Sequence, residues 1–376
     1  MIYVTQRQHP QEKEISWRDL ITDNIPVNET VTGGSAATVT RKYESPSQEL
    51  LTKVSTFEMI EVLKEFNYKH KALFEKERQS MYHTFYIPKR NGKLRQIDAP
   101  NDDLQEALRE LRDILSDRFG VLYHTSGYAY VKKRNTVQCV RKHQQNKSNW
   151  FYHTDISGFF PSTTLDFTMR MCELIFPLSE ICLDKDGRKE LEKALSLGFL
   201  NGGLPQGTVL SPYLCNIISI PADYEIFKRL TQRRFVYTRY ADDIFVSCVQ
   251  SFDPNVITSI IKEIYDEFKA PWTLKPEKTH YGSRKGRNTI LGLKLNADNN
   301  ITVGYKTKEK FRAMLSNFIQ DQIHGKEWTK DEARSLSGLI SYYKMVEPEY
   351  FQGLIKRYNS KYHTSTNILL KQSING

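Results

Sequence analysis

The sequence predicts an α+β fold with two to three domains. The chain has 376 residues, and about 150 residues per domain is a common size. Apolar residues at helical spacing alternate with short β-rich runs that end in turn signals, which is typical of helices packed on small antiparallel sheets. With 39% hydrophobic and 26% charged residues, the composition is that of a globular protein and excludes wholesale disorder and fibrous architectures.

No apolar run approaches the ~18 residues that a membrane span needs, and the N-terminus lacks the basic-then-apolar pattern of a signal peptide. We therefore expect a cytoplasmic protein with no membrane partner. The five cysteines form no CxxC pair, so we expect reduced core thiols and neither a disulfide framework nor a zinc site. A net charge of +10 with 12% aromatic residues favours a nucleic-acid partner, although a merely basic protein would share this composition.

The N-terminal half begins with a polar, slightly acidic extension over residues 1–50, which we expect to be partly flexible. Helical periodicity then predicts amphipathic helices from Thr56 and over 104–119. Between them, two β-rich arms flank Asn91-Gly92, which predicts a β-hairpin because Asn-Gly supplies the positive φ angles of a type I′ turn.

Two of the next segments place acids in or beside predicted strands, and a loop–helix segment lies between them. Residues 149–160 read as a strand in which Asp155 is the only acid. Residues 195–220 move from a glycine-rich loop into an apolar helix that Ser211 and Pro212 are expected to open. The β-rich runs 235–240 and 244–249 flank Ala-Asp-Asp and predict a second hairpin. The chain from about residue 306 has a helical and basic pattern.

Asp155, Asp242 and Asp243 are candidate catalytic residues. Neighbouring buried carboxylates raise one another's pKa, so a cluster of them at neutral pH needs cations. Two Mg²⁺ ions ~4 Å apart, bridged by such carboxylates and a substrate phosphate, would meet this need. The alternative is that Asp242 and Asp243 form an ordinary exposed turn.

Five ordered motifs decide between these readings. The segments PKRNGKLRQI, DISGFF, GGLPQGTVLSP, RYADDIFVS and LKPEKT together resemble the fingers and palm motifs of reverse transcriptases. The resemblance runs from about Thr56 to at least Lys310. Farther along, LSGLISYYKMVEPEYFQGLIKRY resembles the C-terminal helices of bacterial retron reverse transcriptases.

The resemblance implies a right-hand polymerase architecture. The fingers would span 51–154 and include a nucleotide-binding hairpin at 82–100. The palm, an antiparallel sheet with helices, would span 155–300 with a shared fingers/palm segment at 195–220. A small helical thumb would follow over 301–376.

The resemblance also assigns the metal site. Asp155, Asp242 and the backbone carbonyl of Ile156 would bind two Mg²⁺ ions, with Mn²⁺ as a substitute, and Asp243 would be the less essential carboxylate. Phe160 would be a steric gate that selects deoxynucleotides, whereas Phe159 reads better as a core aromatic.

Further residues are expected at the nucleotide and primer. Lys89 and Arg95 would fold over the triphosphate, unless the hairpin is simply a solvated charged one. Gln206 would contact the nucleotide or template base, with Gly207 allowing close backbone approach. Lys278 is similar to the lysine that protonates the pyrophosphate, although Lys275 is close by. Tyr240 would brace the primer end.

Two stretches depart from the retron pattern. Retron enzymes usually carry N-A-x-x-H before the first catalytic strand and V-T-G after the second hairpin. Here Cys139–His143 and Ile290–Gly292 stand at these places, so only His143 and Gly292 agree. His143 would keep an RNA contact or be an ordinary surface histidine. Residues 288–296, which include Gly292, look like the primer-grip hairpin.

The expected function is RNA-directed DNA polymerisation. A bacterial, retron-like enzyme would add dNTPs on a structured non-coding RNA, make an RNA-linked DNA product (msDNA) and serve anti-phage defence. One alternative is a defence-associated reverse transcriptase that makes untemplated, repetitive or self-primed DNA. Another is a nucleoprotein scaffold that restrains a toxic effector protein, with residues 1–50 as the only hint of a partner surface.

Overall fold

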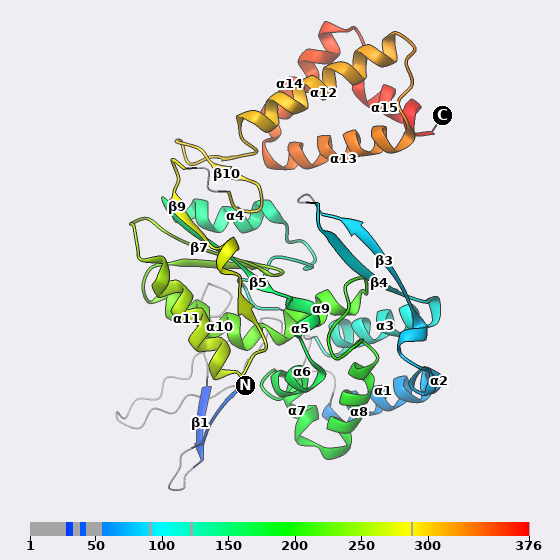
Figure 1. Cartoon of the computed structure of the whole chain (residues 1–376), viewed down its shortest axis with the longest axis vertical. Helices are drawn as coiled ribbons and strands as arrows, with labels where there is room; N and C mark the ends of the chain where they lie inside the picture. Colours follow the sequence, from blue (N-terminus) through cyan, green and yellow to red (C-terminus); the bar gives the residue numbers. More distant parts are fainter. Residues whose placement is uncertain are drawn as a thin grey trace. The chain divides into compact units, whose positions relative to one another are not determined.

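The computed structural model describes residues 28–32, 38–42, 55–89, 92–120, 123–286 and 289–375. Its described residues form helices and antiparallel sheets, which confirms the α+β prediction (Figure 1). Strands β1 (Asn28–Thr32) and β2 (Thr38–Lys42) pair as an antiparallel hairpin within the N-terminal extension. The rest of residues 1–54, including the parts expected to be flexible, lies outside the described residues.

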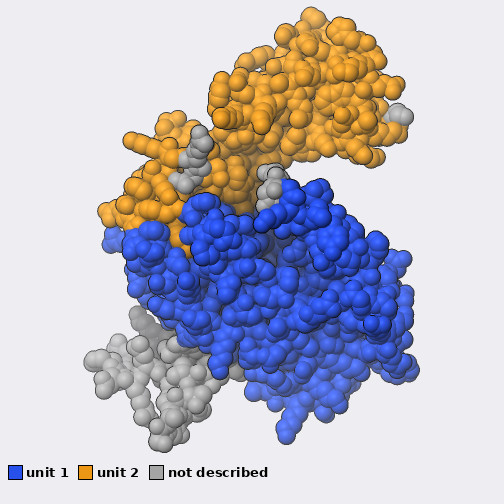
Figure 2. Space-filling view, in the orientation of Figure 1, with its two compact units in different colours: residues 1–134, 153–246, 253–280 blue, residues 135–152, 247–252, 281–376 orange. Residues whose placement is uncertain are grey.

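Two compact units make up the chain (Figure 2). Unit 1 takes residues 1–134, 153–246 and 253–280, and unit 2 takes residues 135–152, 247–252 and 281–376. Each unit gathers segments from both sides of residue 154, where fingers and palm were expected to meet. The fingers, palm and thumb boundaries therefore stay predictions.

Helices dominate unit 1, and three strand systems complete it, of which the β1–β2 hairpin is one. Its helices are α1 (Thr56–Lys69), α2 (Lys71–Glu75), α3 (Asp102–Asp113), α5 (Phe159–Ser162), α6 (Leu165–Cys172), α7 (Leu178–Leu183), α8 (Lys185–Ser196), α9 (Leu210–Ile218), α10 (Ile220–Thr231) and α11 (Pro254–Glu267). Its strands include β3 (Tyr82–Pro88), β4 (Leu94–Pro100), β6 (Val236–Tyr240) and β8 (Thr273–Leu274).

Unit 2 holds α4 (Thr136–Gln145), β10 (Lys294–Leu295), β11 (Ile301–Thr302), α12 (Tyr305–Ile323), α13 (Lys330–Val346), α14 (Pro348–Lys361) and α15 (Thr366–Asn375). Strands β5 (Trp150–Ser157), β7 (Asp243–Cys248) and β9 (His280–Ser283) contribute residues to both units. The larger sheet has the order β6-β7-β5-β8, and β9 also pairs with β5.

The first helix illustrates how the local sequence sets the element ends. Ser55 and Glu58 form a reciprocal capping box that satisfies the first amides of α1. The same helix buries Leu63 and Phe66 and packs beside α8, so the helix predicted from Thr56 is confirmed. The helix predicted over 104–119 is also confirmed, as α3 followed by a π-helical turn at Ile114–Arg118.

The hairpin predicted between these helices is present as β3 and β4. Its register pairs Ile87 with Arg95 and Thr84 with Asp98. At the tip, the Lys89 amide donates to the Lys93 carbonyl at 2.7 Å, and Gly92 has φ +79°. Arg90 and Asn91 lie outside the described residues, so the type of turn stays a prediction.

Two local expectations are wrong. The strand expected over 149–160 ends at Ser157, because Gly158 adopts φ +56° and turns Phe159 and Phe160 into the short helix α5. Ser211 does not cap the helix after the glycine-rich loop: it lies buried inside α9, and its amide donates to the Thr208 hydroxyl at 3.1 Å. Thr208 thus has the capping role expected of Ser211.

Within unit 2, the helical pattern from about 306 is confirmed by α12 to α15. Phe311, Phe351 and Tyr343 form the aromatic contacts of their core. Among the described residues no helix is long and apolar enough to cross a membrane. The cysteines are free thiols, three buried and two half-buried, as the absence of CxxC pairs predicted.

Candidate active site

Two of the three predicted catalytic aspartates, Asp155 and Asp242, are brought together from distant parts of the chain. Asp155 lies on β5, and Asp242 lies in the turn between β6 and β7. The Ile156 amide donates to the backbone carbonyl of Asp242 at 2.9 Å, which ties the turn to the strand immediately after Asp155. Ala241 enters this turn with φ +56°, a conformation that non-glycine residues rarely adopt.

Asp155 is paired with two lysines of the segment after β8. Its carboxylate accepts hydrogen bonds from the Lys275 Nζ at 2.5 Å and the Lys278 Nζ at 2.6 Å. The Lys275 amide also donates to the Asp155 carbonyl at 2.9 Å. Asp155 exposes only 4% of its side chain, whereas Lys278 exposes 52%. The buried Asp155 carboxylate is therefore paired with two lysine ammonium groups whose side chains are partly exposed to solvent.

Asp243 faces a different partner. The Nε2 atom of His153 lies 2.7 Å from its carboxylate, and the His153 ring stacks on Phe245 with ring centres 4.5 Å apart. Asp155 and His153 are two residues apart on β5, so both side chains lie on the same face of that strand. Asp242 and Asp243 therefore have different surroundings, because His153 contacts the carboxylate of Asp243.

The charge distribution leaves Asp242 poorly compensated. Burial, followed by the negative charges of Asp155 and Asp243, raises the pKa of Asp242. Burial acts against the charged form of Lys278, but its hydrogen bond to Asp155 and the nearby carboxylates raise its pKa. The cluster would thus gain from additional positive charge at Asp242, and Lys278 retains its proton.

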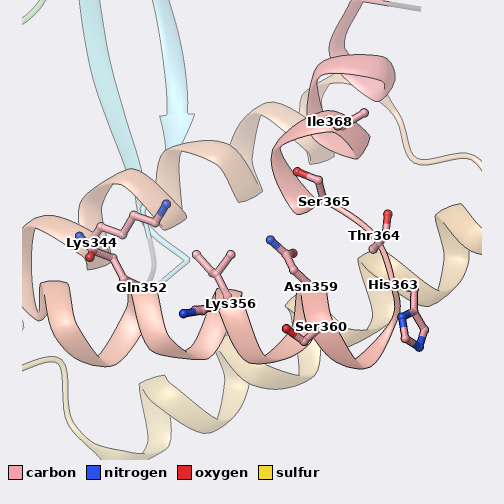
Figure 3. A pocket seen from close by; sticks show the side chains of 10 residues that line it. Lys344, Gln352, Lys356, Asn359, Ser360, His363, Thr364, Ser365 and Ile368 are labelled. Atoms are coloured by element: carbon pink, nitrogen blue, oxygen red, sulfur yellow. The ribbon is translucent and has the colours of Figure 1, made fainter.

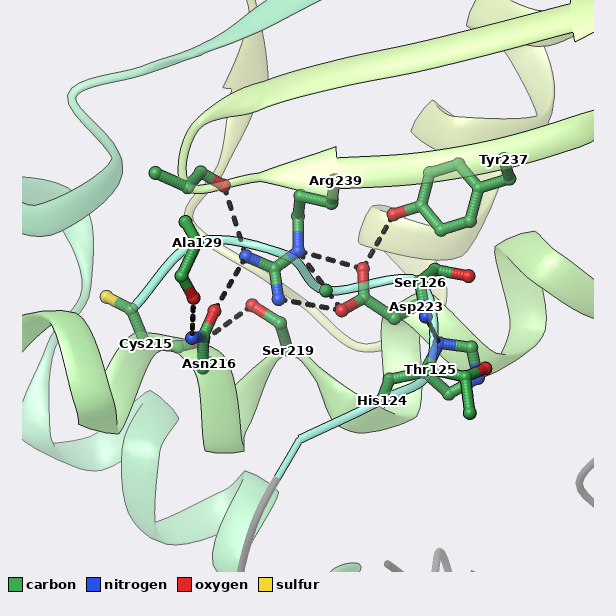
Figure 4. Close-up of polar contacts among 12 residues, drawn as sticks. His124, Thr125, Ser126, Ala129, Cys215, Asn216, Ser219, Asp223, Tyr237 and Arg239 are labelled. Carbon is green, nitrogen blue, oxygen red and sulfur yellow. Dashed lines mark hydrogen bonds and ion pairs between the residues drawn. The ribbon is translucent and has the colours of Figure 1, made fainter. Parts of the chain in front are cut away.

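A buried polar network fixes the strand that leads into the turn (Figure 4). Arg239 and Asp223 form an ion pair at 2.7 Å in which each side chain exposes 2% of its surface. The Tyr237 hydroxyl donates to Asp223 at 2.6 Å, and Arg239 Nη1 donates to the Ala241 carbonyl at 3.1 Å. Because this contact reaches the residue before Asp242, the network helps to set the position of the turn.

The Leu-Pro-Gln-Gly loop packs between the hairpin and the segment that carries Phe160. The Asp98 amide of β4 donates to the Gln206 carbonyl at 2.7 Å, and the Leu204 amide donates to the Phe160 carbonyl at 3.1 Å. A Cβ at Gly207 would lie 2.6 Å from the Asp98 carbonyl oxygen. Gly207 thus allows the loop backbone to approach β4 of the hairpin closely. The close approach expected from the sequence was one to a nucleotide.

The predicted nucleotide contacts have the exposure that such a role requires. Lys89 and Arg95 are exposed, and the β3–β4 register places them on the same face of the hairpin. Phe160 is half-buried, whereas Phe159 exposes only 3% and packs against Trp272, which confirms Phe159 as a core aromatic. Tyr240, at the end of β6, is half-buried.

The two residues expected to bind RNA in unit 2 differ in exposure. His143 is fully buried, its Nδ1 lies 2.6 Å from the Ser247 hydroxyl, and burial lowers its pKa to about 3. It is neither a surface histidine nor accessible to RNA, and we correct both expectations. Gly292 is exposed in a two-residue turn with Leu291, whose φ angles of +53° and +79° are those of a type I′ hairpin.

The carboxylates fit a divalent cation. Asp155 and Asp242 offer hard oxygen ligands, and burial, together with like-charge repulsion, raises the pKa of Asp242. Among the described residues no three acidic, histidine or cysteine side chains gather closely enough to hold a metal alone. A bound ion would therefore need oxygens from the backbone, water or a substrate phosphate as well, as Mg²⁺ commonly does.

The family comparison agrees with this geometry. The model of the family described as reverse transcriptase (RNA-dependent DNA polymerase) matches residues 87–295, more than half of the chain. The chain belongs to the reverse transcriptase family. The matched range holds the paired aspartates, both lysines and the Leu-Pro-Gln-Gly loop, and members of this family generally use divalent metal ions.

Curated relatives of this reverse transcriptase include retron enzymes. The retron Ec73 reverse transcriptase of Escherichia coli is 26% identical over 72% of this chain and 85% of its own length. The retron Mx162 reverse transcriptase of Myxococcus xanthus is 24% identical over 71% of this chain and 58% of its own length. Among solved structures, apo telomerase from Candida tropicalis matches with a TM-score of 0.43 and 11% identity, covering 79% of this chain and 64% of that one.

Sequence reasoning missed several residues at this site. Asp223 is an acid inside an apolar helix, which signals a buried partner, but nothing in the spacing identifies Arg239 as that partner. His153 lies within the motif strand but was not singled out. Lys275 was noted only as a neighbour of Lys278, whereas the structure pairs both lysines with Asp155.

Proposed function

We propose that this reverse transcriptase uses Asp155 and Asp242 to add dNTPs to a primer end on a structured non-coding RNA. The observation that carries the proposal is the proximity of the two aspartates. The Asp242 turn is hydrogen-bonded to the residue after Asp155, and burial, together with the Asp155 charge, raises the pKa of Asp242. We propose a retron-like, RNA-linked DNA product that serves anti-phage defence. The similarity to retron enzymes supports the first of these two expectations.

Asp155, Asp242 and the Ile156 carbonyl would hold two Mg²⁺ ions, for which Mn²⁺ would substitute. When bound, these ions would activate the primer hydroxyl and stabilise the charge that develops on the pyrophosphate. The primer oxygen forms a bond to the α-phosphorus, and the bond from that phosphorus to the pyrophosphate oxygen breaks. Lys278 would donate a proton to the pyrophosphate, and its raised pKa means that the side chain carries that proton beforehand.

The protein would position the nucleotide from several sides. Lys89 and Arg95 would bind the triphosphate, as a point charge and a bidentate donor respectively. Phe160 would exclude a 2′-hydroxyl, and Gln206 would contact the nucleotide or template base. The hydrogen bonds from the Leu-Pro-Gln-Gly loop to β4 and to Phe160 support a shared site for these groups. Tyr240 would brace the primer end, and Gly292 would lie at the primer grip.

A groove in unit 2 would bind phosphates of the RNA or its DNA product. Figure 3 shows polar side chains of α13, α14 and the loop before α15 around a cavity of about 760 Å³. Its lining residues include no acid: Lys344, Gln352, Ile355, Lys356, Asn359, Ser360, His363, Thr364, Ser365 and Ile368. Lys344→Gln with Lys356→Gln should weaken RNA binding and flatten its salt dependence, whereas Lys326→Gln, outside the groove, should do neither.

The decisive experiment expresses the chain with its native flanking DNA and analyses the nucleic acid that copurifies. We expect alkali-resistant DNA of fixed sequence linked to RNA, absent from Asp242→Ala and retained in the exposed control Asp186→Asn. With purified enzyme, Phe160→Ala should admit rNTPs. Plaque assays of the same strains would test the defence role.

Other outcomes would select the alternatives. Repetitive DNA unrelated to the RNA would identify an untemplated or self-primed polymerase. If no DNA depends on Asp242 in infected or uninfected cells, the polymerase proposal is wrong. Phage protection that survives Asp242→Ala would then identify a scaffold that restrains a toxic effector.

A further inference from the structure

Tyr130 has a backbone conformation that its side chain does not favour. Its φ angle is +58°, in the left-handed region where a Cβ crowds the following carbonyl. Among the described non-glycine residues with positive φ, it is the only Phe, Tyr or Trp. Such conformations persist when the surroundings enforce them, and they cluster at functional sites.

The surroundings that enforce this conformation belong to the catalytic strand system. Arg239 donates its amide to the Ser126 carbonyl at 2.7 Å and accepts from the Tyr128 amide at 2.9 Å. The side-chain amide of Asn216 donates to the Ala129 carbonyl at 2.7 Å. The contact between Asn216 and Ala129 is drawn in Figure 4. The loop is therefore fixed up to the residue before Tyr130.

The direction of this loop brings Tyr130 toward the active site. Gly127 and Arg239 form an isolated parallel bridge, so the two segments run in the same direction where they meet. Three residues beyond Gly127 is Tyr130, and three residues beyond Arg239 is Asp242. Partial burial, with the charges of Asp242 and Tyr240 nearby, raises the pKa of the Tyr130 phenol, which agrees with this placement.

Packing does not account for the residue type. Tyr130 exposes 56% of its surface, whereas Tyr128, two residues earlier, exposes 5%. Glycine would adopt the same φ without strain. A bulky, exposed ring that is held in a strained position beside the catalytic turn is thus poorly explained by stability and well placed to meet a substrate.

We propose that Tyr130 contacts the newest base pair at the primer end and helps the enzyme to discriminate matched from mismatched pairs. This inference rests on the proposed polymerase function, which places the primer end at Asp242. The phenol suits the contact because its ring offers a flat apolar surface and its hydroxyl donates a hydrogen bond. Every Watson–Crick pair presents acceptors at its minor-groove edge, so such a contact checks geometry without reading sequence.

Comparing Tyr130→Gly with Tyr130→Phe separates the contributions of the ring, the hydroxyl and the strained backbone. Tyr130→Gly relieves the strained φ, so we expect an unchanged or higher unfolding temperature. We expect its efficiency of matched nucleotide addition to fall about tenfold or more, because one base–aromatic contact has this magnitude. Tyr130→Phe should lose about fivefold, as for one hydrogen bond. In both variants mismatched addition should rise relative to matched addition.

Lys133→Gly is the matched control, since Lys133 has φ +63° in the same loop. It should leave the ratio of matched to mismatched addition unchanged. If Tyr130→Gly adds and discriminates nucleotides like the natural enzyme, the inference is wrong.

A second measurement does not depend on polymerisation. A photo-crosslinking phenylalanine analogue at position 130, in an Asp242→Asn background, should crosslink to the terminal base pair of a bound primer–template. Crosslinks only to distant nucleotides, or none while the primer–template is bound, would overturn the inference. If the natural enzyme adds no nucleotides but the crosslink forms, the polymerase proposal fails and the contact stands.

Discussion

Two ionic clusters of unit 1 use the same kinds of side chain in opposite ways. Arg239 and Asp223 each expose 2% of their side chains, so that pair is closed to water. In the candidate catalytic cluster, formed by Asp155, Asp242, Lys275 and Lys278, Asp155 exposes 4% of its side chain, but its partner Lys278 exposes 52%. Both clusters pair buried carboxylates with cations. Only one of them leaves a cation free to leave its partner for water or a substrate.

The two clusters differ in how completely their charges and hydrogen-bonding groups are paired within the protein. All three guanidinium nitrogens of Arg239 donate to protein oxygens, on Asp223, Asn216 and the Ala241 carbonyl. The candidate catalytic cluster instead leaves Asp242 with a raised pKa, because this carboxyl group is buried and lies near the negative charges of Asp155 and Asp243. The comparison teaches that a structural ion pair is complete without a ligand, whereas a catalytic one retains a charge imbalance that a ligand can correct.

Breaking the closed pair should have the largest effect. Asp223→Ala leaves the Arg239 guanidinium buried without its counter-charge, so we expect the free energy of unfolding to fall by about 3–5 kcal/mol. Asp223→Leu combined with Arg239→Met should recover most of that loss, because apolar side chains often replace a buried ion pair without cost. Denaturant titration followed by circular dichroism measures both. A loss in Asp223→Ala no larger than in an exposed-site variant would remove the distinction between the clusters.

His124, next to the buried Arg239–Asp223 cluster, has a ring nitrogen without a hydrogen-bond partner among the described residues. Its Nδ1 accepts from the Ser126 amide at 3.2 Å, but its buried Nε2 has no partner among the described residues. Burial, aided by Arg239, lowers the pKa of His124 to about 4. An unfolded histidine titrates near pH 6.5, so the unfolded chain binds a proton in this range that the folded chain does not.

Stability should therefore fall as the pH drops from about 6.5 to about 4, and this residue should account for ~3 kcal/mol of the loss. His124→Asn keeps an acceptor for Ser126 and removes the titration, so its stability should depend less on pH. Unfolding titrations of both proteins at pH 7 and pH 4.5 provide the check. Equal slopes would mean that His124 is not held neutral.

Substitution of the two lysines that contact Asp155 should have the smallest effect, and the effect should be on the rate of nucleotide addition. It compares two cations within the candidate catalytic cluster. Lys278→Gln should slow nucleotide addition about 100-fold if its proton reaches the pyrophosphate, as for a general acid. Lys275→Gln should slow it less than about 10-fold, since it then loses only charge. Single-turnover rates over a pH series measure both. The reverse order would assign the proton donor to Lys275.

Sequence motifs predicted that two distant aspartates lie together, because the chemistry of such a centre restricts it to few residue types. Asp155 and Asp242 were assigned from motifs 87 positions apart in the chain, and the structure brings them together. The hairpin was predicted from turn chemistry, and its register places Lys89 and Arg95 on one face as a shared role requires.

The errors arose where tertiary contacts outweigh local pattern. The left-handed φ of Gly158 ended a strand that propensity would have continued through two phenylalanines. His143 is polar enough to suggest a surface position, yet a hydrogen bond to Ser247 permits its full burial. Tyr130 carries no sequence signal, since its strained φ follows from the neighbouring strand.

The backbone contacts of the catalytic aspartates bear on how this enzyme can evolve. Asp155 accepts the Lys275 amide, and Asp242 accepts the Ile156 amide, through main-chain carbonyls that any residue possesses. The scaffold that joins the three segments is therefore independent of the carboxylate side chains. A single substitution at either position removes the acid and keeps the sheet. A lineage that lost either acid would therefore keep both main-chain contacts, because neither contact depends on the type of residue at that position.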